Sequence, residues 1–367
     1  MHYSDRIFKK RKIPWLFIIS LFVFLTVMIL LFAAKSSQEA ADFINGTVSS
    51  AYRRIMAAFG NLFPFSLFEA VIALLIPAFI LVIILSLRSF KRGRGKRFIL
   101  TLLSVIMLIY SGHTLALGIA YYTTPLAARL GIREVEICEE NLTRTLVSLR
   151  DEVNGLSERV EYTERGYSDA NLSLDEISEK ICSSYEKLSL SYPFIPAFES
   201  RAKGVRFSGV MSYLGITGIY TFYTGEANVN TLYPDYDLVF TAAHELSHQR
   251  GILRENEANF MAYLVCSSSE DNYLKYSAAL SMYGYVGSAL YRTNPERYAE
   301  VNASLCDGAR ADMRASNAVY KEYSGTIFED VSSFVNDLFL KSNGTEGVVS
   351  YGMVVKLAVA YHEAKNK

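Results

Sequence analysis

The sequence predicts an α-helical membrane module with three transmembrane helices, followed by a mainly helical, α+β domain with a small sheet. Three observations predict this fold class: long apolar runs in the first third, a helical spacing of apolar residues through most of the remainder, and a short aromatic and β-branched segment between. A chain of 367 residues is long enough for two ordinary domains. We therefore expect a membrane module over residues 1–121 and a second domain over residues 122–367.

Three apolar runs predict the membrane helices, at about residues 13–34, 65–87 and 98–121. Each is long enough to cross a hydrocarbon core of about 30 Å. The first run is longer than an ordinary signal-peptide core and lacks a small-x-small cleavage site, so we interpret it as an anchor. Glu69 lies near one end of the second run, where we expect its carboxylate to reach the membrane interface.

Basic residues predict the orientation of these helices. They are frequent in residues 6–12 and in the 88–97 loop, whereas the loop between the first two runs holds only Lys35, Arg53 and Arg54. Basic loops stay on the cytoplasmic side. We therefore expect a multi-pass protein of the cell membrane with a cytoplasmic N-terminus and an extracytoplasmic second domain.

The charges also exclude one class of partner. Residues 1–120 hold 14 of the 37 basic residues but only 4 of the 37 acidic ones, so the rest of the chain has an excess of 10 acidic residues. An acidic domain repels nucleic acid, and no basic helix or aromatic-basic array suggests nucleic-acid recognition. We expect no nucleic-acid partner.

In the second domain, helical spacing predicts a series of helices. A segment at residues 211–223, with aromatic and β-branched residues between glycines, indicates short strands or a loop that faces the candidate functional site described next. Four cysteines allow three disulfide pairings or free thiols: Cys138, Cys182, Cys266 and Cys306. The expected helices cover about residues 134–165, 172–192, 260–267, 272–291, 295–305, 307–323, 327–340 and 348–365.

The segment His244-Glu245-Leu246-Ser247-His248 is a His-Glu-x-x-His zinc signature. On a helix, residues four apart lie on one face, so His244 and His248 can bind one ion. Zinc makes its bound water acidic near neutral pH, and Glu245 would be the general base that activates this water. Average composition produces such a match by chance in about one chain per hundred of this length, so other features must support it.

A third metal ligand is expected shortly after the second histidine. Gly251 allows the left-handed turn that ends a helix and reverses the chain. The available carboxylates are Glu255 and Glu257, and on a helix only one of them can face the ion. We favour Glu255, because Ala258 and Asn259 share its face and could permit close packing and orient a ligand imidazole; Glu257 remains the alternative.

Several blocks taken together resemble one family. They lie at residues 121–131, 212–218, 225–230, 243–251, 255–260 and 350–352. On these blocks the chain resembles an uncharacterised family of bacterial membrane proteins of unknown function, whose C-terminal part is regarded as a zinc metallopeptidase domain of the gluzincin kind. The resemblance covers nearly the whole chain and implies a zincin-like fold without naming a substrate. The spacing of Glu255, Ala258 and Asn259 also looks like the helix that supplies the third zinc ligand in several gluzincins.

The resemblance further implies where a substrate binds. Gluzincins place an edge strand above the zinc helix, where an extended peptide adds as a further strand. Residues 224–230 read as a strand or turn beside that helix, and Asn228 and Asn230 are candidate substrate contacts. We expect Arg254 to pair with Glu257 rather than to bind a substrate carboxylate.

A tyrosine, histidine or arginine stabilises the oxyanion in such peptidases. The candidates here are Tyr220, Tyr223, Tyr351 and His362, of which His362 is expected to be an ordinary surface or capping residue. No single one of them is dictated by the sequence.

The expected function is that of a membrane-anchored zinc-dependent metallopeptidase, which hydrolyses a peptide or protein substrate on the extracytoplasmic side. The alternative is a zinc-containing sensor or scaffold that binds a peptide or cell-wall fragment with little or no catalysis. A transporter is disfavoured, because three spans are few and Glu69 is their one buried charge.

Overall fold

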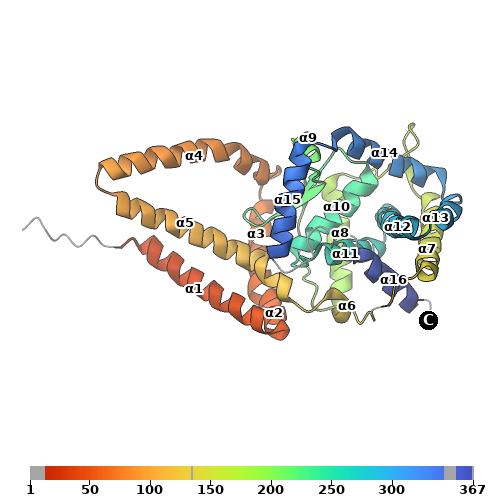
Figure 1. Cartoon of the computed structure of the whole chain (residues 1–367), viewed down its shortest axis with the longest axis horizontal. Coiled ribbons are helices and arrows are strands. Elements are labelled where there is room, and N and C mark those ends of the chain that lie inside the picture. The colour runs from red at the N-terminus through yellow and green to blue at the C-terminus, as the bar shows by residue number, and fades with distance from the viewer. Residues whose placement is uncertain (1–12, 134, 343–352, 366–367) are drawn as a thin grey trace, which may run out of the picture.

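The computed structural model describes residues 13–133, 135–342 and 353–365. Three of its helices are long and apolar enough to cross a membrane: α1 (Trp15–Ser36), α4 (Leu67–Lys91) and α5 (Gly95–Ala116). These apolar helices extend together to one side of the rest of the chain (Figure 1), and α1 packs along α5. They confirm the three predicted apolar runs, with ends shifted by a few residues.

The segment between α1 and α4 is helical, although the sequence analysis treats it as a loop. It forms α2 (Gln38–Ile44), a π-helical turn (Asn45–Ser49) and α3 (Ser50–Asn61). The buried face of α3 carries Arg53 together with the small residues Ala57 and Gly60. Because small residues and one arginine replace large apolar ones on this face, the ordinary apolar pattern of a packed helix is absent.

The remaining chain is mostly helical, as predicted. The helix expected at 134–165 is shorter, since α7 begins after Cys138 and ends at Ser157. The terminal helix begins at Val354, and residues 343–352 lie outside the described part of the chain. The helices after α5 are a 3-10 turn (Gly118–Tyr122), α6 (Leu126–Arg129), α7 (Glu139–Ser157), α8 (Leu174–Ser191), α9 (Ser208–Tyr213), α10 (Asp235–Gln249), α11 (Glu255–Ser267), α12 (Asn272–Thr293), α13 (Pro295–Asn302), α14 (Asp307–Tyr323), α15 (Ile327–Ser342) and α16 (Val354–Lys365).

A three-stranded sheet contains β3 (Ala202–Val205), β4 (Gly218–Thr221) and β5 (Glu226–Asn230), besides a separate pair of β1 (Glu161–Tyr162) and β2 (Ser168–Asp169). The strand order is β3-β5-β4, with β5 parallel to β3 and antiparallel to β4. Among the described residues β4 is therefore an edge strand, and β5 is the centre of the sheet. Both β4 and β5 pack against α10.

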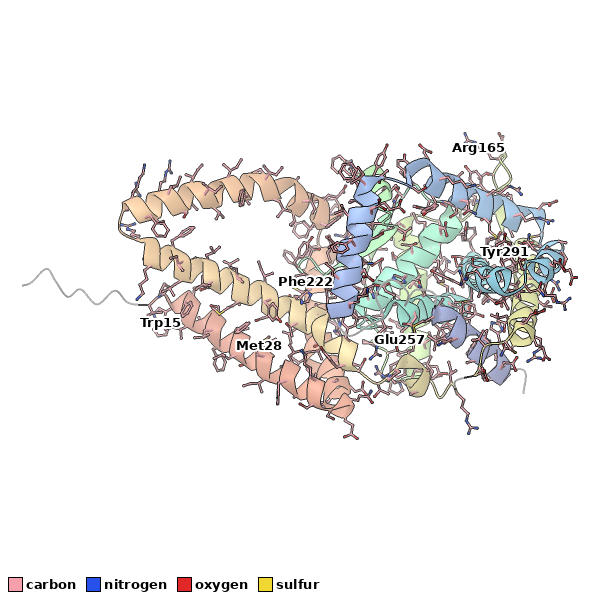
Figure 2. The ribbon with its side chains drawn as sticks, in the orientation of Figure 1. Trp15, Met28, Arg165, Phe222, Glu257 and Tyr291 are labelled. Carbon is pink, nitrogen blue, oxygen red and sulfur yellow. The ribbon has the colours of Figure 1, made fainter. Side chains whose placement is uncertain are left out.

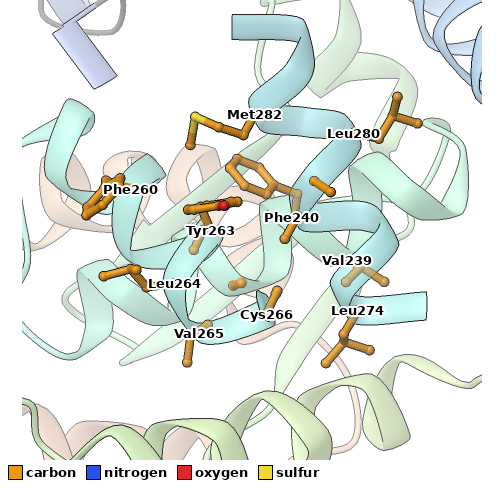
Figure 3. Close-up of a cluster of buried hydrophobic side chains, with 14 of the residues drawn as sticks. Val239, Phe240, Phe260, Tyr263, Leu264, Val265, Cys266, Leu274, Leu280 and Met282 are labelled. Atoms are coloured by element: carbon orange, nitrogen blue, oxygen red, sulfur yellow. The ribbon is translucent and has the colours of Figure 1, made fainter. Parts of the chain in front are cut away.

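The main core lies where α10, α11 and α12 pack together (Figure 3). Phe240 of α10 meets Tyr263 of α11 and Met282 of α12 in this cluster, and all three side chains are buried. Cys266 belongs to the same core, and all four cysteines are free. This packing fixes α10 and α11 relative to each other.

A buried polar network joins the sheet to the first turn of α4. Glu226 of β5 accepts hydrogen bonds from the backbone N–H groups of Leu67 (3.0 Å) and Phe68 (3.0 Å), and it pairs with Lys203 at 2.6 Å. Ser66, the N-cap of α4, donates to Asn228 Oδ1 at 2.7 Å. A carboxylate at a helix N-terminus satisfies its free N–H groups and complements its dipole.

The two asparagines of β5, which the sequence suggested as substrate contacts, are instead bonded within the protein. The Asn228 amide is held by Ser66 and by Thr221 on β4, and Asn230 donates to Ser212 (2.8 Å) and to the Ile216 carbonyl (3.0 Å). Both are buried. The correction follows from topology, since a central strand has its backbone paired on both sides and leaves no edge for a peptide.

Glu69 has a partner in the protein. Its Oε1 accepts a hydrogen bond from the backbone N–H of Phe207 at 2.9 Å, and its expected position at a membrane interface stays a prediction. Like Glu226, it binds the start of α4 to the domain that follows residue 121. Contacts from residues 37–69 therefore cross the boundary predicted at that residue.

Candidate metal centre

Two adjoining helices bring three metal-binding groups together. His244 and His248 lie one turn apart on α10, and Glu255 is the first residue of α11. One ligand atom from each lies within 4.8 Å of the others. The Glu255 Oε2 atom is 3.2 Å from His244 Nε2 and 3.6 Å from His248 Nε2. Two imidazoles and one carboxylate are a donor set that could bind a metal ion.

Each imidazole is oriented through its other nitrogen. His244 Nδ1 donates to the Asn259 side-chain oxygen at 2.8 Å, and His248 Nδ1 donates to the Ile252 carbonyl at 2.9 Å. With both Nδ1 atoms acting as donors, each Nε2 faces Glu255 and is the ring atom available to a metal ion once it is deprotonated. The predicted role of Asn259 in orienting a ligand imidazole thus agrees with its position one turn after Glu255.

Charge interactions dominate the protonation of this cluster. Burial alone would lower the pKa of His248, but the nearby Glu255 carboxylate outweighs it and raises the pKa to about 9. Burial alone would raise the pKa of Glu255, yet the two imidazoles lower it well below its usual range. A carboxylate that attracts positive charge at this point favours a cation between the three groups.

The alternative ligand, Glu257, lies elsewhere. It pairs with Arg254 at 3.1 Å and accepts a hydrogen bond from the backbone N–H of Leu126 at 2.9 Å. Arg254 also donates to the carbonyls of Tyr121 and Thr123, at 2.8 Å and 2.7 Å. The expected pairing of Arg254 with Glu257 is present, and it holds the connection after α5 against the start of α11.

Glu245 lies beneath the edge strand. It is 4% exposed, and its Oε2 atom has no hydrogen-bond partner in the described chain. Burial raises the pKa of Glu245 despite the opposing effect of the two imidazoles. A Cβ atom on Gly218 of β4 would lie 2.5 Å from Glu245 Oε1, so only glycine lets the strand pass this close. The Glu245 carboxylate therefore lies directly against β4 at Gly218.

The turn after α10 is supported from the side of the apolar helices. Gly251 has φ +85°, and a Cβ atom there would lie 2.3 Å from Arg53 Nη2. Arg53 is 1% exposed and donates to the carbonyls of Asn45 (3.0 Å) and Ala116 (3.2 Å). The Asn45 amide donates to the Gly251 carbonyl at 3.4 Å. The last turn of α5 is therefore linked through Arg53 to the turn that carries the chain to Glu255.

Two residues between His248 and Gly251 have structural roles that no sequence motif indicates. Gln249 donates to the Gly225 carbonyl at 2.7 Å, which holds the turn between β4 and β5 against α10. The buried Arg250 guanidinium donates to the Phe198 carbonyl at 2.7 Å and stacks on Tyr185, 4.0 Å from the ring centre. Both side chains fix α10 within the domain.

The four residues expected as candidates for stabilising the oxyanion lie in different surroundings. Tyr220 is buried with its hydroxyl near Arg53, and Tyr223 is partly exposed. His362, expected at the surface, is buried and hydrogen-bonds to the Tyr263 hydroxyl at 3.1 Å. Tyr351 lies outside the described residues.

A further phenol near the centre comes from α12. Burial raises the pKa of Tyr285, and the negative charges of Asp237 and Glu255 raise it further. The charge of Glu255 therefore acts on this phenol. It lies 30 positions after Glu255 in the sequence, without a motif that could have identified it.

Comparison with known protein families gives one result. The family model described as "Protein of unknown function (DUF3810)" matches residues 44–359, which include α3, the sheet and the whole His244, His248 and Glu255 cluster. No curated protein and no solved structure matches the chain. The match extends over most of the chain, in agreement with the expected resemblance to an uncharacterised family. The chain belongs to the DUF3810 family of proteins of unknown function.

Proposed function

We propose that this protein is a membrane-anchored zinc metallopeptidase, with zinc held by His244, His248 and Glu255. The observation that carries the proposal is the convergence of these three ligands beside a buried carboxylate, Glu245, whose Oε2 atom has no partner in the described chain. Two histidines and one glutamate match a catalytic zinc site, in which a further position stays open. The two Nδ1 hydrogen bonds supply the ligand orientation that such sites require.

The chemistry divides between the ion and the chain. A zinc ion at this centre would polarise the scissile carbonyl and make water acidic near neutral pH. Glu245 accepts a proton from the attacking water and delivers it to the amide nitrogen that leaves. Its burial under β4 keeps bulk water away from this proton transfer.

The edge strand β4 supplies the substrate-binding surface in this proposal. It lies directly over Glu245 at Gly218, and its outer edge is unpaired among the described strands. An extended peptide could add there through backbone hydrogen bonds, which bind peptides without regard to sequence. Tyr285 is the proposed oxyanion donor, because the charge of Glu255 acts on its phenol from a separate helix.

The placement in a membrane is also part of the proposal. The three apolar helices expose most of their large apolar side chains, and α4 has no buried residue. Such surfaces are stable in a bilayer and unstable in water. The basic residues at 6–12 and 88–97 favour a cytoplasmic location for the far ends of these helices, which puts the metal centre on the extracytoplasmic side.

The decisive experiment is a metal and activity measurement on the full chain purified in detergent. We expect one equivalent of zinc and cleavage of members of a peptide library, and we expect both to disappear in His248→Ala. Removing the metal with a chelator should stop cleavage, and zinc should restore it. Bound zinc without any cleavage in the wild type would favour a zinc-containing sensor or scaffold, and absence of bound metal would refute both functions.

Replacing Asn259 with alanine should weaken zinc binding about 10- to 100-fold, because His244 loses the partner that orients its ring. A competition titration with a chromophoric chelator measures this affinity. The control is Asn317→Ala on α14, where the amide donates to a carbonyl of its own helix. An unchanged zinc affinity in Asn259→Ala would show that the hydrogen bond has no orienting role.

A further inference from the structure

Helix α15 exposes an apolar face and packs with a largely polar one. Its exposed large apolar side chains recur at the spacing of one helix face. The half-buried side instead carries Glu329, Asn336 and Asp337, together with Phe339 and the buried Leu340. This is the reverse of an ordinary surface helix. The exposed side chains are 51% to 79% exposed and comprise Ile327, Phe328, Val331, Phe334, Val335 and Leu338.

Both ends of α15 are linked to the ends of apolar helices that adjoin the domain. At its start, Thr326 donates to the Tyr213 carbonyl of α9 at 2.9 Å, and α9 begins next to Phe207, which is bonded to Glu69 in the first turn of α4. Near its end, the ring of Phe339 packs 5.9 Å from His113, in the last turn of α5. Helix α15 thus extends between the ends of α4 and α5 that adjoin the domain.

The direction of α15 agrees with this placement. In Figure 1 it runs across the axes of the apolar helices, at the point where they meet the domain. Further apolar side chains are exposed on α9 and in the residue before it: Phe207, Val210 and Tyr213. Because Tyr213 also contacts Tyr323 just before α15, with ring centres 5.0 Å apart, these side chains continue the exposed face.

We propose that the exposed face of α15 lies in the outer leaflet of the bilayer that the apolar helices cross, so that α15 is an interfacial helix. The inference rests on the membrane placement proposed above and adds a second kind of membrane contact. Amphipathic helices bury their apolar face at the boundary of headgroups and acyl chains. Helix α15 is joined to the ends of α4 and α5 that adjoin the domain, and it runs across these helices. It would therefore be held at that depth.

The charges indicate which lipid property is recognised. Helix α15 carries Glu329, Asp330 and Asp337 but only Lys341, and Lys341 already pairs with Asp337 at 2.7 Å. Its attachment therefore depends on burial of apolar side chains and not on attraction to anionic headgroups. We expect the same membrane contact in neutral and in anionic bilayers.

Tryptophan fluorescence of the full chain in nanodiscs tests this contact, because the chain has a single tryptophan, Trp15. In a Trp15→Phe background, the variants Phe334→Trp and Val331→Trp place the probe on α15, and Tyr291→Trp is the control. Tyr291 is 56% exposed and lies on the part of the domain far from the apolar helices (Figure 2). The discs hold one chain each and contain either ordinary lipids or lipids with brominated acyl chains.

We expect both α15 probes to emit at shorter wavelength than the Tyr291→Trp control and to be quenched by brominated lipids, equally in neutral and anionic discs. Emission and quenching like those of the control would overturn the proposal. A blue shift without quenching by brominated lipid would also overturn it, because protein would then cover the face. Quenching of native Trp15 reports separately whether α1 is inserted, so failure of the membrane placement is distinguishable from failure of the α15 contact.

Discussion

The variant Glu245→Gln is expected to lower kcat by about 10²- to 10⁴-fold, because the amide cannot accept the proton of the attacking water. The shape of the side chain is kept, so the close contact with Gly218 survives. His244, His248 and Glu255 are unchanged, and the zinc content should stay at the wild-type value. Steady-state kinetics on the best peptide from the library, with metal analysis of the same samples, measures both quantities.

A matched control makes the same change on the same helix. Asp235→Asn also converts a half-buried carboxylate of α10 into an amide, nearly three turns before Glu245 and outside the metal cluster. It should retain most of the activity. If Glu245→Gln keeps wild-type turnover, Glu245 is not the general base; if zinc is lost along with activity, the substitution has damaged the centre and the kinetic loss cannot be assigned to proton transfer.

Glu226→Gln should destabilise the protein by about 3–5 kcal/mol, the usual effect of removing one partner from a buried ion pair. Lys203 would keep a buried charge without a carboxylate to balance it, beside the carbonyls of Gly60 and Phe65. The first turn of α4 would at the same time lose a charged acceptor for two N–H groups. Denaturant or thermal unfolding of the full chain in detergent measures the loss.

Two further variants isolate the cause of this loss. Glu300→Gln removes an exposed ion pair with Arg297, for which little change is expected. The double variant Lys203→Met, Glu226→Gln removes both buried charges, so it should be more stable than Glu226→Gln alone. A Glu226→Gln protein as stable as the wild type would show that the pair and the helix cap contribute nothing measurable.

The parts of the centre that the sequence could predict are local. His244 and His248 share a helix face, and Glu255 follows within a short turn, so spacing alone places them together. The glutamates also had distinguishable neighbours: Ala258 and Asn259 lie on the Glu255 face, and Arg254 stands close to Glu257. The three apolar helices were equally predictable, because the length and hydrophobicity of a span are properties of one continuous segment.

The parts that could not be predicted depend on contacts between distant residues. Ser66 and Asn228 are bonded across 162 positions, and nothing in the local pattern of β5 distinguishes an asparagine that bonds to the N-cap of α4 from one that binds substrate. The same holds for Arg53 against Gly251 and for Tyr285 near Glu255. The spacing in α15 predicts a helix, but a helix period does not state whether its apolar face is buried by protein or exposed.

The support that Arg53 and Asn45 give to Gly251 limits where this centre can operate. A protease that cut the chain between α5 and α6 would separate the domain from the guanidinium and the amide that hold the turn before Glu255. It would also separate Glu226 of β5 from the first turn of α4, whose N–H group donates a hydrogen bond to it. For the membrane-anchored peptidase proposed above, we therefore expect that a released domain would be inactive. Every encounter with substrate would then take place at the membrane surface, and a substrate that is itself membrane-bound would be found by diffusion in two dimensions instead of three.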